Sequence, residues 1–180
     1  NNSNIEYVNY LLEKGADPDL PDLHGEYPLQ IAINLSSFVV VESLIKTGKV
    51  DLNRRLNTSN SRNMTYLHLA AKSDDSKILE KILMLNMIDV NAVDNGGETP
   101  LMIATKNQKI DNIIMLFERE DLDYLCCNID GDDAFAILRK QTSKCFSFNS
   151  PKSKDIYKNI LIACITDLQQ RKKCSIHKWH

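Results

Sequence analysis

Cysteine, histidine and clustered aspartate are the residue types in this chain that could bind a metal ion. Cys174, His177 and His180 are close enough in sequence to be three zinc ligands. Tetrahedral zinc needs a fourth ligand, for which Cys145 is a distant candidate. The acidic turn at 130–133 lacks the other ligands of a calcium loop. We therefore expect no metal site and no cofactor, and we interpret the end of the chain as a tail.

No combination of residues predicts catalysis. The chain shows no pair of catalytic carboxylates, no Ser-His-Asp order and no Cys–His nucleophile context. Gly25, Gly97 and Gly131 each close a short polar turn, without the surrounding pattern of a nucleotide-binding loop. The sequence therefore predicts that this segment is not an enzyme and has no small-molecule substrate.

Composition and charge favour a folded protein that binds neither membranes nor nucleic acids. Of 180 residues, 43% are hydrophobic and 26% are charged, and the net charge is −2. No apolar run reaches the ~18 residues that would span a bilayer. A nucleic-acid contact through Arg54, Arg55, Arg62 and the basic run 171–173 stays an alternative. The near-neutral charge and the lack of interleaved aromatic residues argue against it.

The five cysteines are odd in number and lie towards the C-terminal half, at positions 126, 127, 145, 164 and 174. That distribution indicates free thiols in a reducing compartment rather than a disulfide framework. We expect an intracellular protein, cytoplasmic or nuclear or both. The chain begins with Asn1 rather than methionine, so we also expect it to be a piece of a longer protein.

One phrase recurs along the chain and predicts how its elements are arranged. It is most complete at 94–101 (DNGGETPL), and its echoes are at 22–29 (DLHGEYPL) and 128–135 (NIDGDDAF). A diverged copy ends at Leu67, so the closing residues of the four copies are 38, 34 and 34 positions apart. A fixed period of this size is typical of stacked units that cannot bury their own apolar faces alone.

Apolar spacing predicts helices within each unit. We expect a helix over 4–13 that ends at Gly15, a short helix that begins near Pro28, and a second helix over 38–45. The longer step between the copies closed by Leu29 and Leu67 indicates an insertion within 47–63. Asn63 stands there where the other copies have a turn glycine, so a positive φ is expected. A longer amphipathic helix is predicted over 155–171.

These phrases resemble ankyrin repeats, over roughly residues 4–141. The resemblance implies an all-α, ankyrin-repeat solenoid of stacked helix-turn-helix units, here with a C-terminal capping helix. It also implies that His68, in Thr-Tyr-Leu-His-Leu-Ala-Ala, ties neighbouring turns by hydrogen bonds. The predicted parts are a partial repeat at 1–21, a repeat with insertion at 22–58, repeats at 59–93 and 94–127, a degenerate repeat at 128–149, and a capping helix with a basic tail at 150–180.

A weaker resemblance connects residues 17–25, together with the long step after them, to the inhibitor-of-kappa-B proteins. It implies an alternative function as a regulator of a Rel-type transcription factor. The lysine-rich C-terminal region departs from the acidic tail expected of those proteins, so no Rel-binding residue is transferred. A further alternative is the regulatory ankyrin portion of a larger enzyme or channel.

The resemblance implies a concave groove that binds another protein, lined by turn tips and by the ends of the first helices. Asn34, Lys72, Lys106 and Lys140 each follow a closing residue by five positions and would form a basic ladder for an acidic or phosphorylated segment. The predicted contacts are Leu23, His24, Glu26, Asn34, Lys72, Ser73, Asn95, Glu98, Lys106, Asn107, Asp130 and Lys140. Two alternatives stay open: the lysines are ordinary exposed helix ends, or the interface is the region of Phe146, Phe148 and the long helix.

Overall fold

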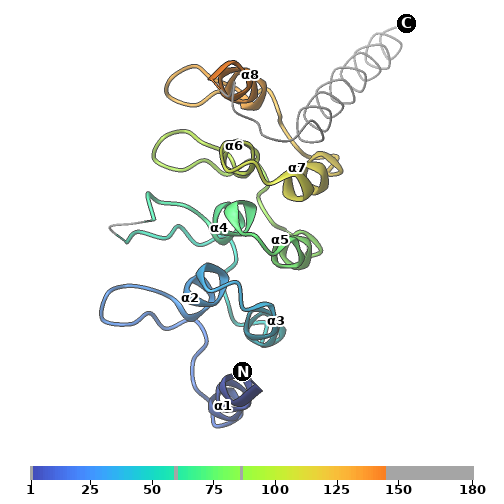
Figure 1. Cartoon of the computed structure of the whole chain (residues 1–180). Coiled ribbons are helices and arrows are strands. Elements are labelled where there is room, and N and C mark those ends of the chain that lie inside the picture. The colour runs from blue at the N-terminus through green and yellow to red at the C-terminus, as the bar shows by residue number, and fades with distance from the viewer. Residues whose placement is uncertain (1, 59–60, 86, 145–180) are drawn as a thin grey trace, which may run out of the picture. The chain divides into compact units, whose positions relative to one another are not determined.

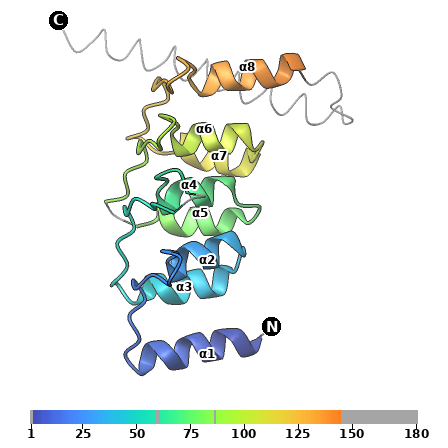
Figure 2. The same ribbon diagram turned by 90° about the vertical axis from the view of Figure 1, so that its left-hand side faces the viewer.

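Helices make up the regular structure of the residues that the structure describes. The computed structural model describes residues 2–58, 61–85 and 87–144 (Figures 1 and 2), and the chain divides into two compact units, 1–137 and 138–180. Helix α8 begins in the first unit and ends in the second. Within the described residues the helices are α1 (Asn2–Glu13), α2 (Pro28–Asn34), α3 (Phe38–Lys46), α4 (Tyr66–Lys72), α5 (Ser76–Leu83), α6 (Pro100–Lys106), α7 (Ile110–Phe117) and α8 (Ala134–Lys144).

The first unit is a stack of helix pairs. Helix α2 packs on α3, α4 on α5, and α6 on α7. The first helices, α2, α4 and α6, form one column, and the second helices, α1, α3, α5 and α7, form another (Figure 1). The loops before each first helix project on the side away from the second helices (Figure 1). The expected all-α stack is therefore confirmed in the part of the chain that the structure describes.

Small residues and early prolines explain why the first helices are short and close together. Pro28 and Pro100 begin α2 and α6, where a fixed φ suits the first helical turn and the missing N–H costs no hydrogen bond. Thr99 caps α6 by accepting a hydrogen bond from the Met102 N–H at 3.3 Å. Ala70 and Ala104 are fully buried, and their small side chains allow the first helices to pack closely.

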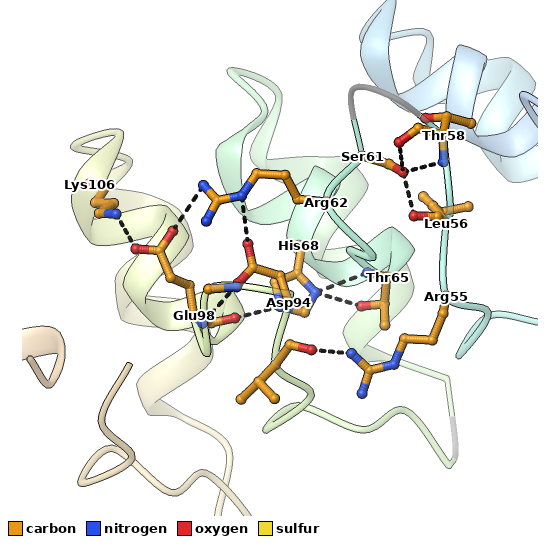
Figure 3. Close-up of polar contacts among 12 residues, drawn as sticks. Arg55, Leu56, Thr58, Ser61, Arg62, Thr65, His68, Asp94, Glu98 and Lys106 are labelled. Atoms are coloured by element: carbon orange, nitrogen blue, oxygen red, sulfur yellow. Dashed lines mark hydrogen bonds and ion pairs between the residues drawn. The ribbon is translucent and has the colours of Figure 1, made fainter. Parts of the chain in front are cut away.

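The insertion folds into a closed turn between α3 and α4. The N–H of Leu56 donates to the carbonyl of Met64 at 2.8 Å, and these two residues form an isolated bridge. The hydroxyl of Ser61 bonds to the carbonyls of Leu56 and Thr58 inside this turn (Figure 3). Asn63 has φ 61°, as expected from its place in the repeat. Arg62 also has a positive φ, of 49°.

Several predictions from the sequence lie outside the described residues. They are the capping helix at 155–171, the basic run at 171–173, the Phe146 and Phe148 region, and the tail with its cysteine and histidines. Across residues 2–58, 61–85 and 87–144, no helix has both the length and the apolar character needed to cross a membrane. The same residues contain no group of three or more His, Cys, Asp or Glu side chains that could hold a metal ion.

Candidate partner-binding face

The first helices and the loops that precede them form one face of the first unit, which we define as the inner face (Figure 1). Ten of the twelve predicted contact residues are exposed or half-buried, and the other two, Ser73 and Glu98, are buried. Lys140 belongs to the second unit. The exposed or half-buried residues are Leu23, His24, Glu26, Asn34, Lys72, Asn95, Lys106, Asn107, Asp130 and Lys140.

Glu98 is the centre of a charge network rather than an exposed acidic tip. Its side chain is 4% exposed, and one carboxylate oxygen accepts a hydrogen bond from the Lys106 ammonium (Figure 3). Arg62 Nη1 lies 3.9 Å from the other oxygen. The charge of Glu98, one of the predicted contacts, is therefore compensated within the chain. The Lys106 ammonium is already paired with Glu98, so its charge contributes less to binding a ligand.

Asp94 extends this network and fixes the loop that carries Glu98. Its Oδ1 accepts hydrogen bonds from the N–H groups of Gly96 at 2.8 Å and Glu98 at 2.9 Å. Its Oδ2 lies 3.6 Å from Arg62 Nε (Figure 3). The carbonyl of Arg62 also accepts from the N–H of Asn95 at 2.9 Å. The inserted turn thus joins two neighbouring repeats. Arg62 makes both links, one through its side chain and one through its backbone carbonyl.

The other two arginines of the nucleic-acid alternative also make contacts within the chain. Arg54 forms an ion pair with Asp19 and lies over the ring of Tyr27, 4.6 Å from its centroid. Arg55 donates to the backbone carbonyl of Val93 (Figure 3). The contacts with Asp19 and Val93 join neighbouring repeats, which gives the arginines a structural role.

His68 has the structural role that the resemblance implied. It is fully buried, and its Nδ1 accepts from the Thr65 N–H at 3.1 Å (Figure 3). The proton is therefore on Nε2, which donates to the backbone carbonyl of Glu98 at 2.9 Å. Burial lowers the pKa of His68 below its usual value of 6.5. A neutral histidine thus connects the start of α4 to the next loop.

The first residue of the repeated phrase holds each turn tip in a fixed shape. Asp22 Oδ1 accepts from the N–H groups of His24 and Glu26, both at 2.8 Å. Asn128 Oδ1 likewise accepts from the N–H groups of Asp130 at 3.0 Å and Asp132 at 2.9 Å. The hydrogen bond from the Glu26 N–H is the main cause of a lowered pKa at Asp22. These bonds present Leu23 to solvent with its side chain fully exposed.

A hollow of about 170 Å³ brings together three of the predicted contacts at the ends of α2 and α4. Asn34, Lys72 and Ser73 line it above an apolar floor of Ile33 and Leu69. The Ser73 hydroxyl lies 3.4 Å from that of Ser36, which also lines the hollow. Asp74 contributes an acid at the rim, but its carboxylate is ion-paired with Lys109. Lys72 is exposed and makes no ion pair with another described residue.

Asn112 is an important residue that the sequence did not single out. Its side chain is buried in α7, and Nδ2 donates to the carbonyls of Ala70, Ala71 and Ser73 at 3.3, 3.0 and 3.2 Å. These carbonyls lie at the end of α4, where the helix offers no donors of its own. Asn112 falls 34 positions after the buried Ile78. A polar residue at an apolar repeat position was therefore the available signal.

Comparisons with known proteins agree with the repeat architecture. A family model described as ankyrin repeats (3 copies) matches residues 1–94 and 53–126. An ankyrin repeat protein of Fowlpox virus, FPV031, is 29% identical over 206 residues, which covers 96% of this chain and 59% of that protein. Alpha-latrocrustotoxin-Lt1a of Latrodectus tredecimguttatus is 33% identical over 105 residues, 58% of this chain and 7% of the toxin. Human Rabankyrin-5 is 30% identical over 111 residues, 62% of this chain and 9% of that protein. The chain thus spans less than two thirds of the length of each of these relatives.

Proposed function

Because its repeats match the family model from residue 1 to 126, this chain belongs to the ankyrin repeat family, and we propose that its inner face binds an acidic or phosphorylated segment of another protein. Ankyrin repeats are in general protein-interaction modules without chemistry of their own. We propose the same for this chain: an adaptor or regulatory role with no catalysis, cofactor or small-molecule substrate.

The hollow at the ends of α2 and α4 is the observation that carries the proposal. Its rim offers the Lys72 ammonium, the Asn34 amide and the Ser73 hydroxyl, all of which can donate to an anionic oxygen. The carboxylate of Asp74 is already neutralised by Lys109. The net positive charge of the hollow therefore favours a carboxylate or phosphate of a partner.

This proposal assigns less of the binding to the basic ladder than the sequence hypothesis did. Lys106 is bonded to Glu98, and Lys140 lies in the second unit, so Lys72 carries most of the recognition. Turn-tip residues complete the surface, because their loops are held rigid by the first residue of each phrase. They are Leu23, His24, Glu26, Asn95 and Asp130. A rigid surface loses little conformational entropy when it binds.

The test is selection of peptides on the immobilised protein, followed by measurement of their affinities with charge-reversed variants. We expect a random peptide library, with phosphoserine included, to yield acidic or phosphorylated sequences. Lys72→Glu should weaken their binding about tenfold or more, because it removes an attraction and adds a repulsion of similar size. Lys77→Glu is the matched control, since Lys77 is exposed on α5 in the other column.

The control variant should bind the selected peptides within about twofold of the unchanged protein. Circular dichroism melting of both variants verifies that they are folded. Selected peptides without acidic character, or equal losses for Lys72→Glu and Lys77→Glu, would show that the hollow is not the recognition site.

A second candidate function follows from the small fraction of two relatives' length that this chain covers. It aligns with 7% of the toxin and 9% of human Rabankyrin-5. We therefore also propose that these repeats act as a regulatory or targeting portion of a longer protein. Free cysteines at 126 and 127 support a reducing, intracellular site of action.

A further inference from the structure

An ion pair closes the outer side of the contact between α3 and α5. Lys81 of α5 donates to the carboxylate of Glu42 in α3 at 3.0 Å. Lys46 lies 3.8 Å from the same oxygen. Together they neutralise the acid and cover the junction of two neighbouring second helices. The Lys81 hydrogen bond is the largest cause of the lowered pKa of Glu42.

The next junction of the same column, between α5 and α7, lacks this bridge. Glu80 repeats the acid of the earlier junction, but Met115 stands 34 positions after Lys81, where the repeat would place the cation. Asp111 in α7 and Glu118, the residue that follows α7, add two more carboxylates. None of these three acids forms an ion pair with another of the described residues.

An open groove replaces the bridge. It has a volume of about 520 Å³, and its apolar lining includes Leu83, Met84, Ile114 and Met115. Met84, the residue that follows α5, is 69% exposed, and Ile114 of α7 is 44% exposed. The three unpaired acids border this apolar floor. A contiguous exposed apolar patch rimmed by polar residues is typical of an interaction site.

Arg119 is the one basic residue among the described residues that line the groove. Its charge is paired with a carboxylate of the same chain. Its Nε and Nη2 donate to both carboxylate oxygens of Asp121, at 3.0 and 2.9 Å. A third hydrogen bond goes from Nη1 to the carbonyl of Leu83 at 3.2 Å. The groove therefore keeps a net negative rim around an apolar floor.

We propose that the groove between α5 and α7 binds a cationic amphipathic helix of a partner protein. A lysine or arginine of that helix takes the position that Lys81 has at the previous junction, and its apolar stripe covers Met84, Ile114 and Met115. This surface belongs to the second helices, so it is separate from the inner face and would serve a second partner or a second segment. The two sites can be occupied together.

The dimensions and lining of the groove suit a helix. Helices α5 and α7 have 8 residues each, which is about 12 Å at 1.5 Å per residue. That length matches two turns of a bound helix with anchors at i, i+3 or i+4, and i+7. Methionine side chains adapt to the shape of such a ligand better than branched residues do.

Methionine methyl signals provide a site-specific test. The chain has five methionines: Met84 and Met115 line the groove, Met64 and Met102 are buried in the core, and Met87 is exposed elsewhere. The protein is labelled with ¹³C at the methionine methyls and assigned with Met→Leu variants. The probe is a synthetic helix of about 14 residues, with a leucine stripe flanked by lysines. Its counterpart has glutamate in place of every lysine.

We expect the lysine probe to shift the Met84 and Met115 signals in a saturable way, while the other three signals stay in place. The glutamate counterpart should produce no saturable shift. Neutralising the rim with Glu80→Gln, Asp111→Asn and Glu118→Gln together should weaken the lysine probe about tenfold. Equal shifts at Met87, or equal binding of the two probes, would overturn the proposal.

Met115→Lys is the decisive variant, because it restores the cation that the repeat has at Lys81. It should pair with Glu80 and fill the groove, so binding of the lysine probe should fall at least tenfold while the protein stays folded. Met87→Lys adds the same charge at an exposed residue that does not line the groove, and it should leave the affinity within about twofold. Binding that survives Met115→Lys would overturn the proposal. Groove signals that depend on protein concentration without probe would also overturn it, in favour of a second copy of the chain.

Discussion

Lys106→Met separates the two interpretations of the lysines on the inner face. The sequence hypothesis places Lys106 in a ladder that contacts a partner, so its loss would affect binding and leave stability unchanged. In the structure its ammonium bonds to the buried carboxylate of Glu98. Methionine keeps the length of the side chain and removes the charge, so stability becomes the informative measurement.

The size of the effect follows from the surroundings of Glu98. Its side chain is 4% exposed, so water cannot replace the lost donor fully. A hydrogen bond to a charged group contributes about 1.5–3 kcal/mol. Arg62 stays 3.9 Å from the second oxygen and continues to compensate part of the charge. We therefore expect Lys106→Met to lower the free energy of unfolding by about 2 kcal/mol.

Urea unfolding followed by circular dichroism measures this change. With a dependence on urea of about 2 kcal/mol per molar, the midpoint should fall by about 1 M. Lys72→Met is the matched control and should change stability by less than about 0.5 kcal/mol. Combining Lys106→Met with Glu98→Gln should cost about 1 kcal/mol less than the sum of the two single changes, because the uncompensated charge is gone. Equal midpoints for Lys106→Met and Lys72→Met would refute the network as a source of stability.

Two further predictions concern buried polar groups. The pKa of His68 is lowered by burial, so the unfolded chain binds a proton more readily; stability should be full above pH 6.5 and decrease as the pH falls below it. Urea midpoints at pH 7.5 and pH 5 check this, and a His68→Gln variant without a smaller decrease would contradict it. Asn112→Ala should cost about 2–3 kcal/mol, because buried carbonyls lose a donor at the end of α4. Asn34→Ala, at an exposed site, is its control, and similar melting temperatures for the two variants would count against the prediction.

The repeated phrase predicted the fold because its residues act locally. Pro28 and Pro100 set the start of a helix, and alanines at one repeat position allow first helices to approach closely. Asn63 adopts the positive φ that its position required. Each of these effects depends on a residue and its nearest neighbours, so a single sequence contains enough information to predict it.

The ion pairs were harder to predict because they join different repeats. The sequence shows that Glu98 belongs to a turn phrase, but not that Arg62 reaches it from an insertion 36 positions earlier. The burial and pairing of Glu98, a predicted contact, could not be foreseen for that reason. Asn112 stood out only as a polar residue at an apolar repeat position, and its partners could not be predicted because they are backbone carbonyls of another helix.

Deviations from the repeat explain where this stack can differ from its relatives. Positions that keep the period build the same contact again, as α2, α4 and α6 do in their column. A position that breaks the period leaves a group without its usual partner, as Met115 does opposite Glu80. The same argument applies to Lys72, which forms no ion pair with another described residue, whereas Lys106, one repeat later, pairs with Glu98. An interaction surface in a repeat protein is therefore best sought at a repeat whose side chains lack the internal partners that the equivalent side chains of neighbouring repeats have.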